Sequence, residues 1–212
     1  SKVLPDGVPP QATALLVRRN GDVVLGSAKG LAVWRRGFWE WFGWDAQARH
    51  FSSEASPHAG GAWPVTALAE DARGQLWVGG SQGLAVIAGG YTDPARWMTG
   101  AMQGLPSPVV RQLLPWQGGM LVATAAGLRW HGAQAWQDLP ASWQPWQGKE
   151  VTLLRQGEDG GVLVGTADGL WMAGASRVLQ LQSRPVDDAQ VVQGVLHVLQ
   201  QQTLWMSPWP AA

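Results

Sequence analysis

Short apolar segments separated by glycine-rich turns run along the whole chain. In the clearest stretch, an apolar segment at 65–70 is followed by a tight turn and by a second segment at 76–80 that ends in small residues. A loop closing on Gly-Leu starts a third segment at 83–88, and a less regular fourth one at 95–99 carries Arg and Trp. Segments of this length, bounded by Gly, Asp and Pro, predict antiparallel β-strands joined by tight turns.

This unit repeats along the sequence. Four stretches align without gaps, GDVVLGSAKGL at 21–31, GQLWVGGSQGL at 74–84, GGMLVATAAGL at 118–128 and GGVLVGTADGL at 160–170, and a weaker fifth copy, GVLHVLQQQTL, lies at 194–204. A period of roughly 40 residues, with four short strands per period, is typical of a propeller blade. We therefore expect an all-β fold, a β-propeller of five four-stranded blades.

The two ends of the chain are complementary. Gly7 and Pro9 precede the first strand at the offsets seen in the link QGLPSPV at 103–109, and the last copy lacks a fourth strand. Residues 1–5 are therefore predicted to complete the last blade and to close the ring, which would remove open sheet edges. The alternative is an excerpt from a longer array. The predicted single domain has blades at about 12–64, 65–108, 109–150, 151–189 and 190–212 plus 1–11.

A family resemblance rests on the best-formed copies. VTALAEDARGQLWVGGSQGLAVI at 65–87 resembles the two-component-regulator propeller repeat, and so do QGLPSPVV at 103–110 and DGGVLVGTADGLW at 159–171. The resemblance implies a sensor-type or interaction domain of a bacterial signalling protein, with a periplasmic or extracellular location. The family has no fixed catalytic residues to transfer to this chain.

Composition narrows the classes of function. The 212 residues carry 15 Lys and Arg against 15 Asp and Glu, and a charged fraction of 14% disfavours a nucleic-acid partner. The absence of cysteine excludes disulfide scaffolds and iron–sulfur clusters. No apolar stretch is long enough to cross a bilayer, so we expect no membrane insertion of this chain. We also expect no cofactor.

Catalytic and metal-ligating patterns are weak. Asp71, Glu158 and Asp159 precede turn glycines, where such side chains bond the local backbone. The first strands contribute a polar lining without the acid pair that glycoside hydrolysis requires, namely Thr13, Thr66, Glu70, Arg111, Gln112, Thr152 and Arg155. The histidines lack the spacing of a metal site: His50, His58, His131 and His197. We therefore predict that the chain is not an enzyme.

Tryptophan is unusually frequent, with 15 residues against 3 Phe and 1 Tyr. Trp77, Trp171 and Trp205 lie on predicted strands of the repeat, the last two at the same repeat position, and all three are expected in the core. The insertion RRGFWEWFGW at 35–44 has no place in a standard blade, so its rings form a candidate partner-binding patch: Trp39, Trp41 and Trp44. Strand alternation puts Trp39 and Trp41 on one face. The alternative is that the insertion folds back and buries these rings.

Two further features bear on binding. The aromatic group at 136–147 could stack on sugars or fill gaps between outer strands. The loops between second and third strands place four polar side chains at matching offsets on one face, and these are the candidate ligand-binding residues: Lys29, Gln82, Asp168 and Gln202. The predicted function is a non-enzymatic module that binds a protein partner or a small-molecule or glycan ligand. The alternatives are a lectin-like glycan-binding propeller and a scaffold subunit of a larger complex.

Overall fold

The computed structural model describes residues 11–45, 48–53, 63–158, 160–174 and 177–209. Within these ranges the chain forms five antiparallel sheets and one short 3₁₀ turn, η1 (Ala101–Gln103). The prediction of an all-β fold is confirmed. No helix in the described part of the chain is long and apolar enough to cross a membrane.

Each sheet is a meander in which sequence neighbours pair. The first sheet contains β1 (Ala12–Val17), β2 (Val23–Ser27), β3 (Gly30–Arg35), β4 (Phe38–Asp45) and β5 (His50–Ser52). The second contains β6 (Val65–Glu70), β7 (Leu76–Gly80), β8 (Gly83–Ile87) and β9 (Arg96–Met98). The third contains β10 (Val110–Trp116), β11 (Gly119–Thr124), β12 (Gly127–His131) and β13 (Trp136–Gln137).

The last two sheets follow the same order. The fourth contains β14 (Leu153–Gln156), β15 (Val162–Thr166), β16 (Gly169–Ala173) and β17 (Val178–Gln182). The fifth contains β18 (Asp188–Val192), β19 (Val195–Gln200) and β20 (Thr203–Pro208). Sequence analysis did not anticipate β5, which pairs with the long β4 of the insertion.

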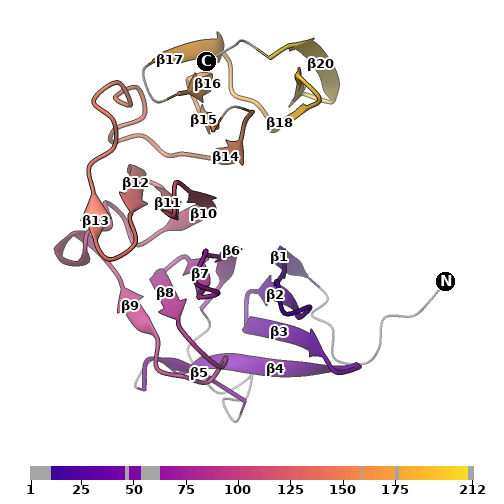
Figure 1. Cartoon of the computed structure of the whole chain (residues 1–212), viewed down its shortest axis with the longest axis vertical. Coiled ribbons are helices and arrows are strands. Elements are labelled where there is room, and N and C mark those ends of the chain that lie inside the picture. Colours follow the sequence, from indigo (N-terminus) through magenta and orange to yellow (C-terminus); the bar gives the residue numbers. More distant parts are fainter. Residues whose placement is uncertain (1–10, 46–47, 54–62, 159, 175–176, 210–212) are drawn as a thin grey trace.

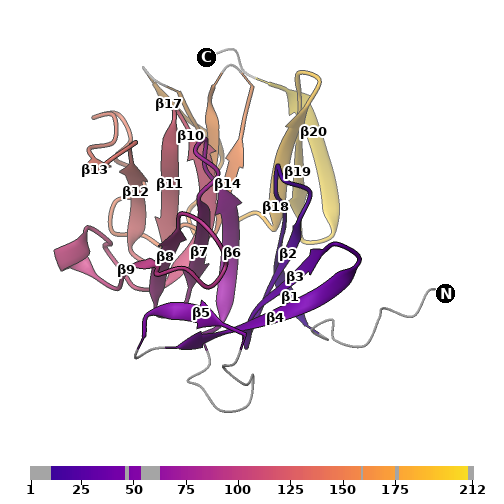
Figure 2. The same ribbon diagram turned by 60° about the horizontal axis from the view of Figure 1, so that its bottom comes forward.

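The five sheets stand side by side around an arc that is open between the first and the last sheet (Figure 1). The first strand of each sheet lies on the inside of the arc, and these strands contact one another in chain order. A second view shows the sheets standing upright beside one another (Figure 2). The segment predicted to close the ring, residues 1–5, lies outside the described residues.

Side chains on the first strands bind neighbouring sheets to each other. A bulge at Thr13 and another at Thr66 turn these residues out of the regular pairing. The Thr13 hydroxyl donates to the carbonyl of Val65 at 2.5 Å, and the Thr66 hydroxyl donates to the carbonyl of Val110 at 2.6 Å. Part of the predicted polar lining of the arc thus joins the sheets.

Apolar side chains fill the spaces between neighbouring sheets. The first interface is aromatic: the ring of Trp44 lies 5.0 Å from Phe51, 4.9 Å from Trp63 and 4.7 Å from Trp97, measured between centroids. Trp77 and Trp171 are buried as predicted. The prediction for Trp205 is wrong, because 58% of its surface is exposed. No fourth strand covers β20 within the described part of the fifth sheet.

The repeated Gly-Leu step has a steric cause. Gly83 and Gly169 begin third strands with φ values of +143° and +131°. A Cβ atom would come within 2.4 Å of the Met98 carbonyl oxygen at Gly83, and within 2.0 Å of the Gln182 carbonyl oxygen at Gly169. The fourth strand therefore packs so closely on this turn that only glycine fits.

Candidate functional site

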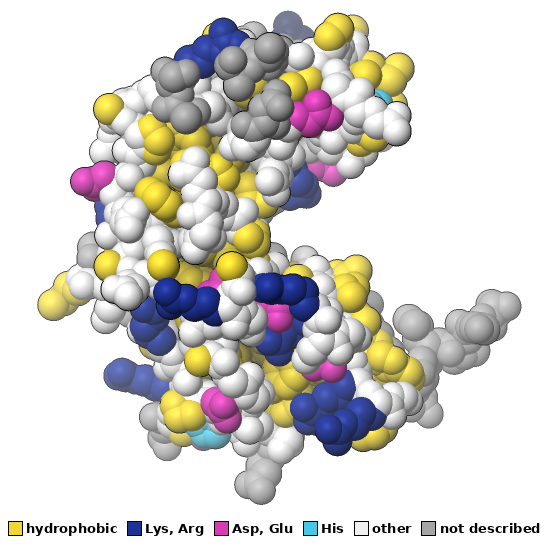
Figure 3. Space-filling view, viewed as in Figure 1, with side chains coloured by type: hydrophobic (Ala, Val, Ile, Leu, Met, Phe, Trp, Pro, Cys, Tyr) yellow, Lys and Arg dark blue, Asp and Glu magenta, His cyan; other side chains and the backbone are white. Residues whose placement is uncertain are grey.

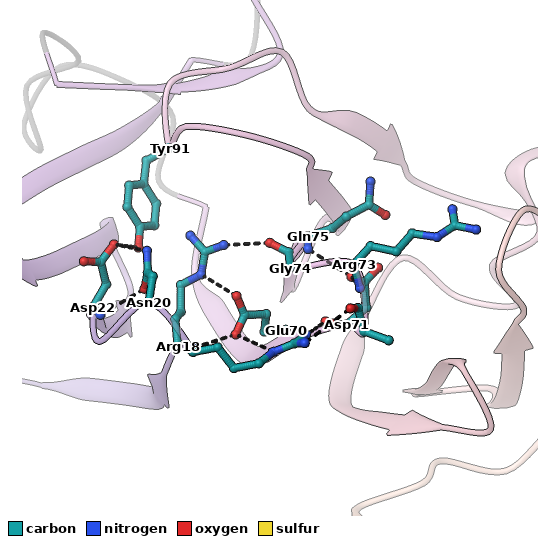
Figure 4. Close-up of polar contacts among 11 residues, drawn as sticks. Arg18, Asn20, Asp22, Glu70, Asp71, Arg73, Gly74, Gln75 and Tyr91 are labelled. Carbon is teal, nitrogen blue, oxygen red and sulfur yellow. Dashed lines mark hydrogen bonds and ion pairs between the residues drawn. The ribbon is translucent and has the colours of Figure 1, made fainter.

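A polar cluster joins the hairpin turns of the first two sheets (Figure 4). The Arg18 guanidinium donates from Nε to Glu70 at 3.2 Å and from a terminal nitrogen to the carbonyl of Gly74 at 2.7 Å. The backbone N–H of Arg19 donates to the second Glu70 oxygen at 2.9 Å. Both side chains of the Arg18–Glu70 pair are buried, with 8% and 9% exposure.

The electrostatics of this cluster favour the charged pair. Burial by itself raises the pKa of the Glu70 carboxyl, but the Arg19 N–H and the Arg18 guanidinium outweigh it and hold that pKa below its usual value. Burial raises the pKa of Tyr91 to about 12. The Tyr91 hydroxyl donates to Asp22 at 2.7 Å, and the Arg18 guanidinium lies 5.3 Å from the centre of its ring. Because these groups bind one another, we assign the cluster a role in holding two sheets together.

The acidic turn residues also serve the backbone. The Asp71 carboxylate accepts hydrogen bonds from the backbone N–H groups of Arg73 and Gln75, both at 2.9 Å, and from the indole of Trp77 at 3.0 Å. Glu158 accepts the N–H of Gly194 in the next sheet at 2.6 Å. The turn interpretation is confirmed for Asp71. Asp159 lies outside the described residues.

The four candidate ligand-binding residues lie in separate hairpin turns along one edge of the arc. Lys29, Gln82, Asp168 and Gln202 are all exposed, and each belongs to a different sheet. Asp168 accepts a hydrogen bond from Lys149 at 2.5 Å in an exposed ion pair. The third sheet contributes no residue to this predicted set.

A hollow lies beside the third sheet and has a volume of about 300 Å³. It exists because the fourth strand is short: β13 pairs only with Trp130 and His131, so no strand lies beside Gly127–Arg129. After β13 the chain passes Pro140 and folds into turns that form the opposite wall. Their rings enter the core, since Trp143 is 3% and Trp146 is 1% exposed. None of the four predicted ligand-binding residues lines this hollow.

Two residues that line the hollow each contain a buried donor atom with no partner among the described residues. These atoms are Nε of Arg129 and Nε1 of Trp146. The Arg129 guanidinium carbon lies 5.9 Å from the centre of the Trp136 ring, and Trp136 is held by a hydrogen bond to the carbonyl of Gln103 at 2.5 Å. A buried donor without a partner costs folding free energy, so both atoms mark local strain beside the hollow.

The remaining lining of the hollow combines apolar and polar groups. Leu128 and Leu139 contribute apolar surface, whereas Gln137, Gln144 and the exposed carboxylate of Asp138 are polar. The sequence held one signal for this site: Arg129 occupies a third-strand position where the first two sheets have Ala32 and Ala85. The sequence analysis did not select Arg129, because it considered only the turns between second and third strands as ligand-binding positions.

The predicted partner-binding patch is divided by the structure. Trp44 is 5% exposed and belongs to the core between the first two sheets, which corrects its assignment to a contact surface. Trp39 and Trp41 are half-buried and share one face of the first sheet, whereas Glu40 points to the other and pairs with Arg35. The expected alternation is therefore present, and the question of a partner concerns Trp39 and Trp41 alone.

Antiparallel sheets set around an arc, with their first strands innermost, define the β-propeller class of architecture. Within that class, residues 64–82 match the family model described as two component regulator propeller, which confirms the resemblance found in the second repeat. Among curated proteins, none is similar in sequence to the chain.

Solved structures with a similar fold include extracellular domains of putative one- and two-component systems and also enzymes. The extracellular domain of a putative one-component system from B. thetaiotaomicron is 16% identical, with a TM-score of 0.60 over 94% of this chain and 35% of that chain. A virginiamycin B lyase from Staphylococcus aureus is 11% identical, with a TM-score of 0.59 over 95% and 71% of the two chains. A putative gluconolactonase is 14% identical, with a TM-score of 0.56 over 91% and 72%.

Similarity at these identities establishes the fold alone. The chain spans 35% of the length of the extracellular domain that it matches. The prediction that the chain is not an enzyme is corrected here, because a lyase and a putative gluconolactonase share this fold. The same fold occurs in a lyase and in extracellular domains of putative one- and two-component systems, so the fold does not exclude an activity.

Proposed function

We propose that this chain is a ligand-binding propeller module of an extracytoplasmic bacterial sensor, and that it takes a small carboxylate-bearing molecule in the hollow of the third sheet. One observation carries the proposal: Arg129, a charged residue without an ion-pair partner among the described residues, is one of the residues that line this cavity. The location outside the cytoplasm is supported by the extracellular domains of similar fold.

The chemistry of the hollow favours a carboxylate. A guanidinium presents N–H donors in a planar fork that matches the two oxygens of a carboxylate. Arg129 has no ion-pair partner among the described residues, so its charge is available for a ligand. Asp138 is exposed at the cavity and suits a ligand that also carries a donor, such as an amino group or a sugar hydroxyl. The volume of about 300 Å³ is at the lower end of the range for small-molecule sites.

Stacking of a neutral glycan has less support. The rings of Trp143 and Trp146 are buried, and the Trp143 indole donates to the carbonyl of Gly174 at 2.8 Å. These rings fill the space between the third and fourth sheets and leave no open aromatic face for a pyranose. Neutral sugars therefore enter the experiment as controls for carboxylated ones.

The test compares matched probes on the 212-residue chain. We expect galacturonate or alanine to raise the melting temperature and to give a calorimetric binding signal, whereas galactose and alaninamide do not. Arg129→Gln should abolish the response, and Arg184→Gln, which alters an exposed arginine away from the hollow, should retain it. The melting temperature without ligand shows whether each variant folds. Equal responses to acid and neutral probes, no response to either acid, or full binding by Arg129→Gln would refute the proposal.

A further inference from the structure

The face of the first sheet that no other described sheet covers is apolar along β1–β4. Cross-strand pairing places its residues together, and we call them the leading face: Leu15, Val17, Val23, Leu25, Ala32, Trp34, Trp39 and Trp41. Leu15 and Val17 are 64% and 66% exposed, Ala32 is buried and the other five are half-buried, and none of the eight carries a charge. A contiguous apolar face that is partly exposed to solvent is typical of an interaction site.

The repeat shows what this surface is built to contact. In the second sheet the equivalent positions include Leu68, Val78 and Ala85, and all three pack in the interface with the first sheet. In the fourth sheet the equivalents include Leu154 and Val164, which pack against the third sheet. In each later sheet, therefore, this side contacts the preceding sheet.

The opposite end of the arc presents the complementary surface. On β18–β20 the side turned away from the fourth sheet carries four apolar residues, which we call the trailing face: Val192, Leu199, Leu204 and Met206. These four side chains are 39% to 66% exposed. Asp188, Gln190 and His197 lie on the same side. In the earlier sheets the same side packs against the leading side of the next sheet. Hydrophobic side chains border both sides of the opening of the arc (Figure 3).

We propose that two copies of this chain associate head to tail, with the trailing face of one copy on the leading face of the other. The contact continues the four sheet-to-sheet interfaces present within the chain, and both halves of it are exposed on the same molecule. Trp39 and Trp41 widen the leading face beyond a standard sheet and supply the large aromatic contacts that dominate protein interfaces. Because each copy keeps one free face, the contact is heterologous and extends to larger assemblies as concentration rises.

The test uses sedimentation or light scattering of the 212-residue chain over a range of concentrations. We expect the mass to rise above the 22.7 kDa of one chain. Val17→Lys on the leading face and Leu204→Lys on the trailing face should each give a single-chain mass. Met102→Lys is the control, because Met102 is fully exposed on η1, away from both faces, and its association should be unchanged.

Mixing the two variants tests the direction of the contact. Val17→Lys keeps an intact trailing face and Leu204→Lys keeps an intact leading face, so an equimolar mixture should form a one-to-one dimer that grows no further. If either variant alone still associates, the contact joins like faces and the head-to-tail arrangement is wrong. A single-chain mass for the unsubstituted protein at every concentration would overturn the proposal. Circular dichroism spectra confirm that the variants are folded.

Discussion

Replacing Glu70 by Gln tests whether burial or interatomic distance determines how much an ion pair between sheets stabilises the protein. The substitution keeps the shape of the side chain but removes the charge that faces Arg18, whose side chain is 8% exposed. Removing one partner of a buried pair leaves an uncompensated charge, and we expect a loss of about 3 kcal/mol in the free energy of unfolding. With a urea m-value of about 3 kcal/mol/M, the unfolding midpoint should fall by about 1 M.

The chain contains a matched control in the pair between Arg111 and Glu150. Its atoms are closer, at 2.6 Å, but its side chains are 42% and 44% exposed. Glu150→Gln should therefore cost less than about 1 kcal/mol, and raising the salt concentration should reduce that cost further. The reasoning fails if urea unfolding gives equal losses for the two variants, or a larger one for Glu150→Gln, because distance would then outweigh burial.

Three further outcomes are expected. Trp171→Ala should cost about 3 to 5 kcal/mol in urea unfolding and Trp205→Ala less than about 1 kcal/mol, since the two rings are 6% and 58% exposed; similar losses would contradict the packing described. Gly169→Ala should lower the free energy of unfolding by at least about 2 kcal/mol, because the added Cβ meets a backbone carbonyl oxygen. Gly118→Ala, where φ is +72° and the surrounding space is open, should lower it by about 1 kcal/mol, and calorimetry measures both. The pKa of Glu70 in the folded protein lies below its usual value, so the ionised carboxylate stabilises the fold. This contribution to the free energy of unfolding is complete above the unfolded pKa of about 4.3 and is lost as pH falls through the folded pKa. Glu70→Gln should therefore make stability less dependent on pH in the acid range.

Local pattern in the sequence predicts the strands, because alternation and turn glycines report on the backbone directly. The strand predicted at 65–70 and its partner at 76–80 have those bounds in the structure. Trp205 was misplaced because repeat equivalence assumes equivalent neighbours, and the described part of the fifth sheet has three strands. A repeat alignment describes the individual sheet well and the ends of the array poorly.

The candidate site was harder to predict, because it arises where the repeat is interrupted. The hollow depends on a fourth strand of two residues and on a loop whose rings enter the core, neither of which has an alternating pattern. The ligand-binding residues predicted in hairpin turns, such as Lys29 and Asp168, are exposed and belong to different sheets. At the repeat position of Arg129 the other sheets have Ala or Trp, so an alignment of the repeats can detect this charged residue.

The threonine contacts on the first strands have a consequence for unfolding. Thr13 and Thr66 each reach into the next sheet, whereas Thr152 bonds within its own sheet at 3.4 Å. Asp187, at the same position of the last repeat, accepts the N–H of Gln201 in the β19–β20 turn of its own sheet. In a linear array each unit is stabilised by its neighbours, so opening begins at the most weakly coupled terminus. Amide hydrogens of β18–β20 should therefore exchange first, and those of β6–β8, whose sheet is bonded through Thr13 and Thr66 to both neighbours, should exchange last.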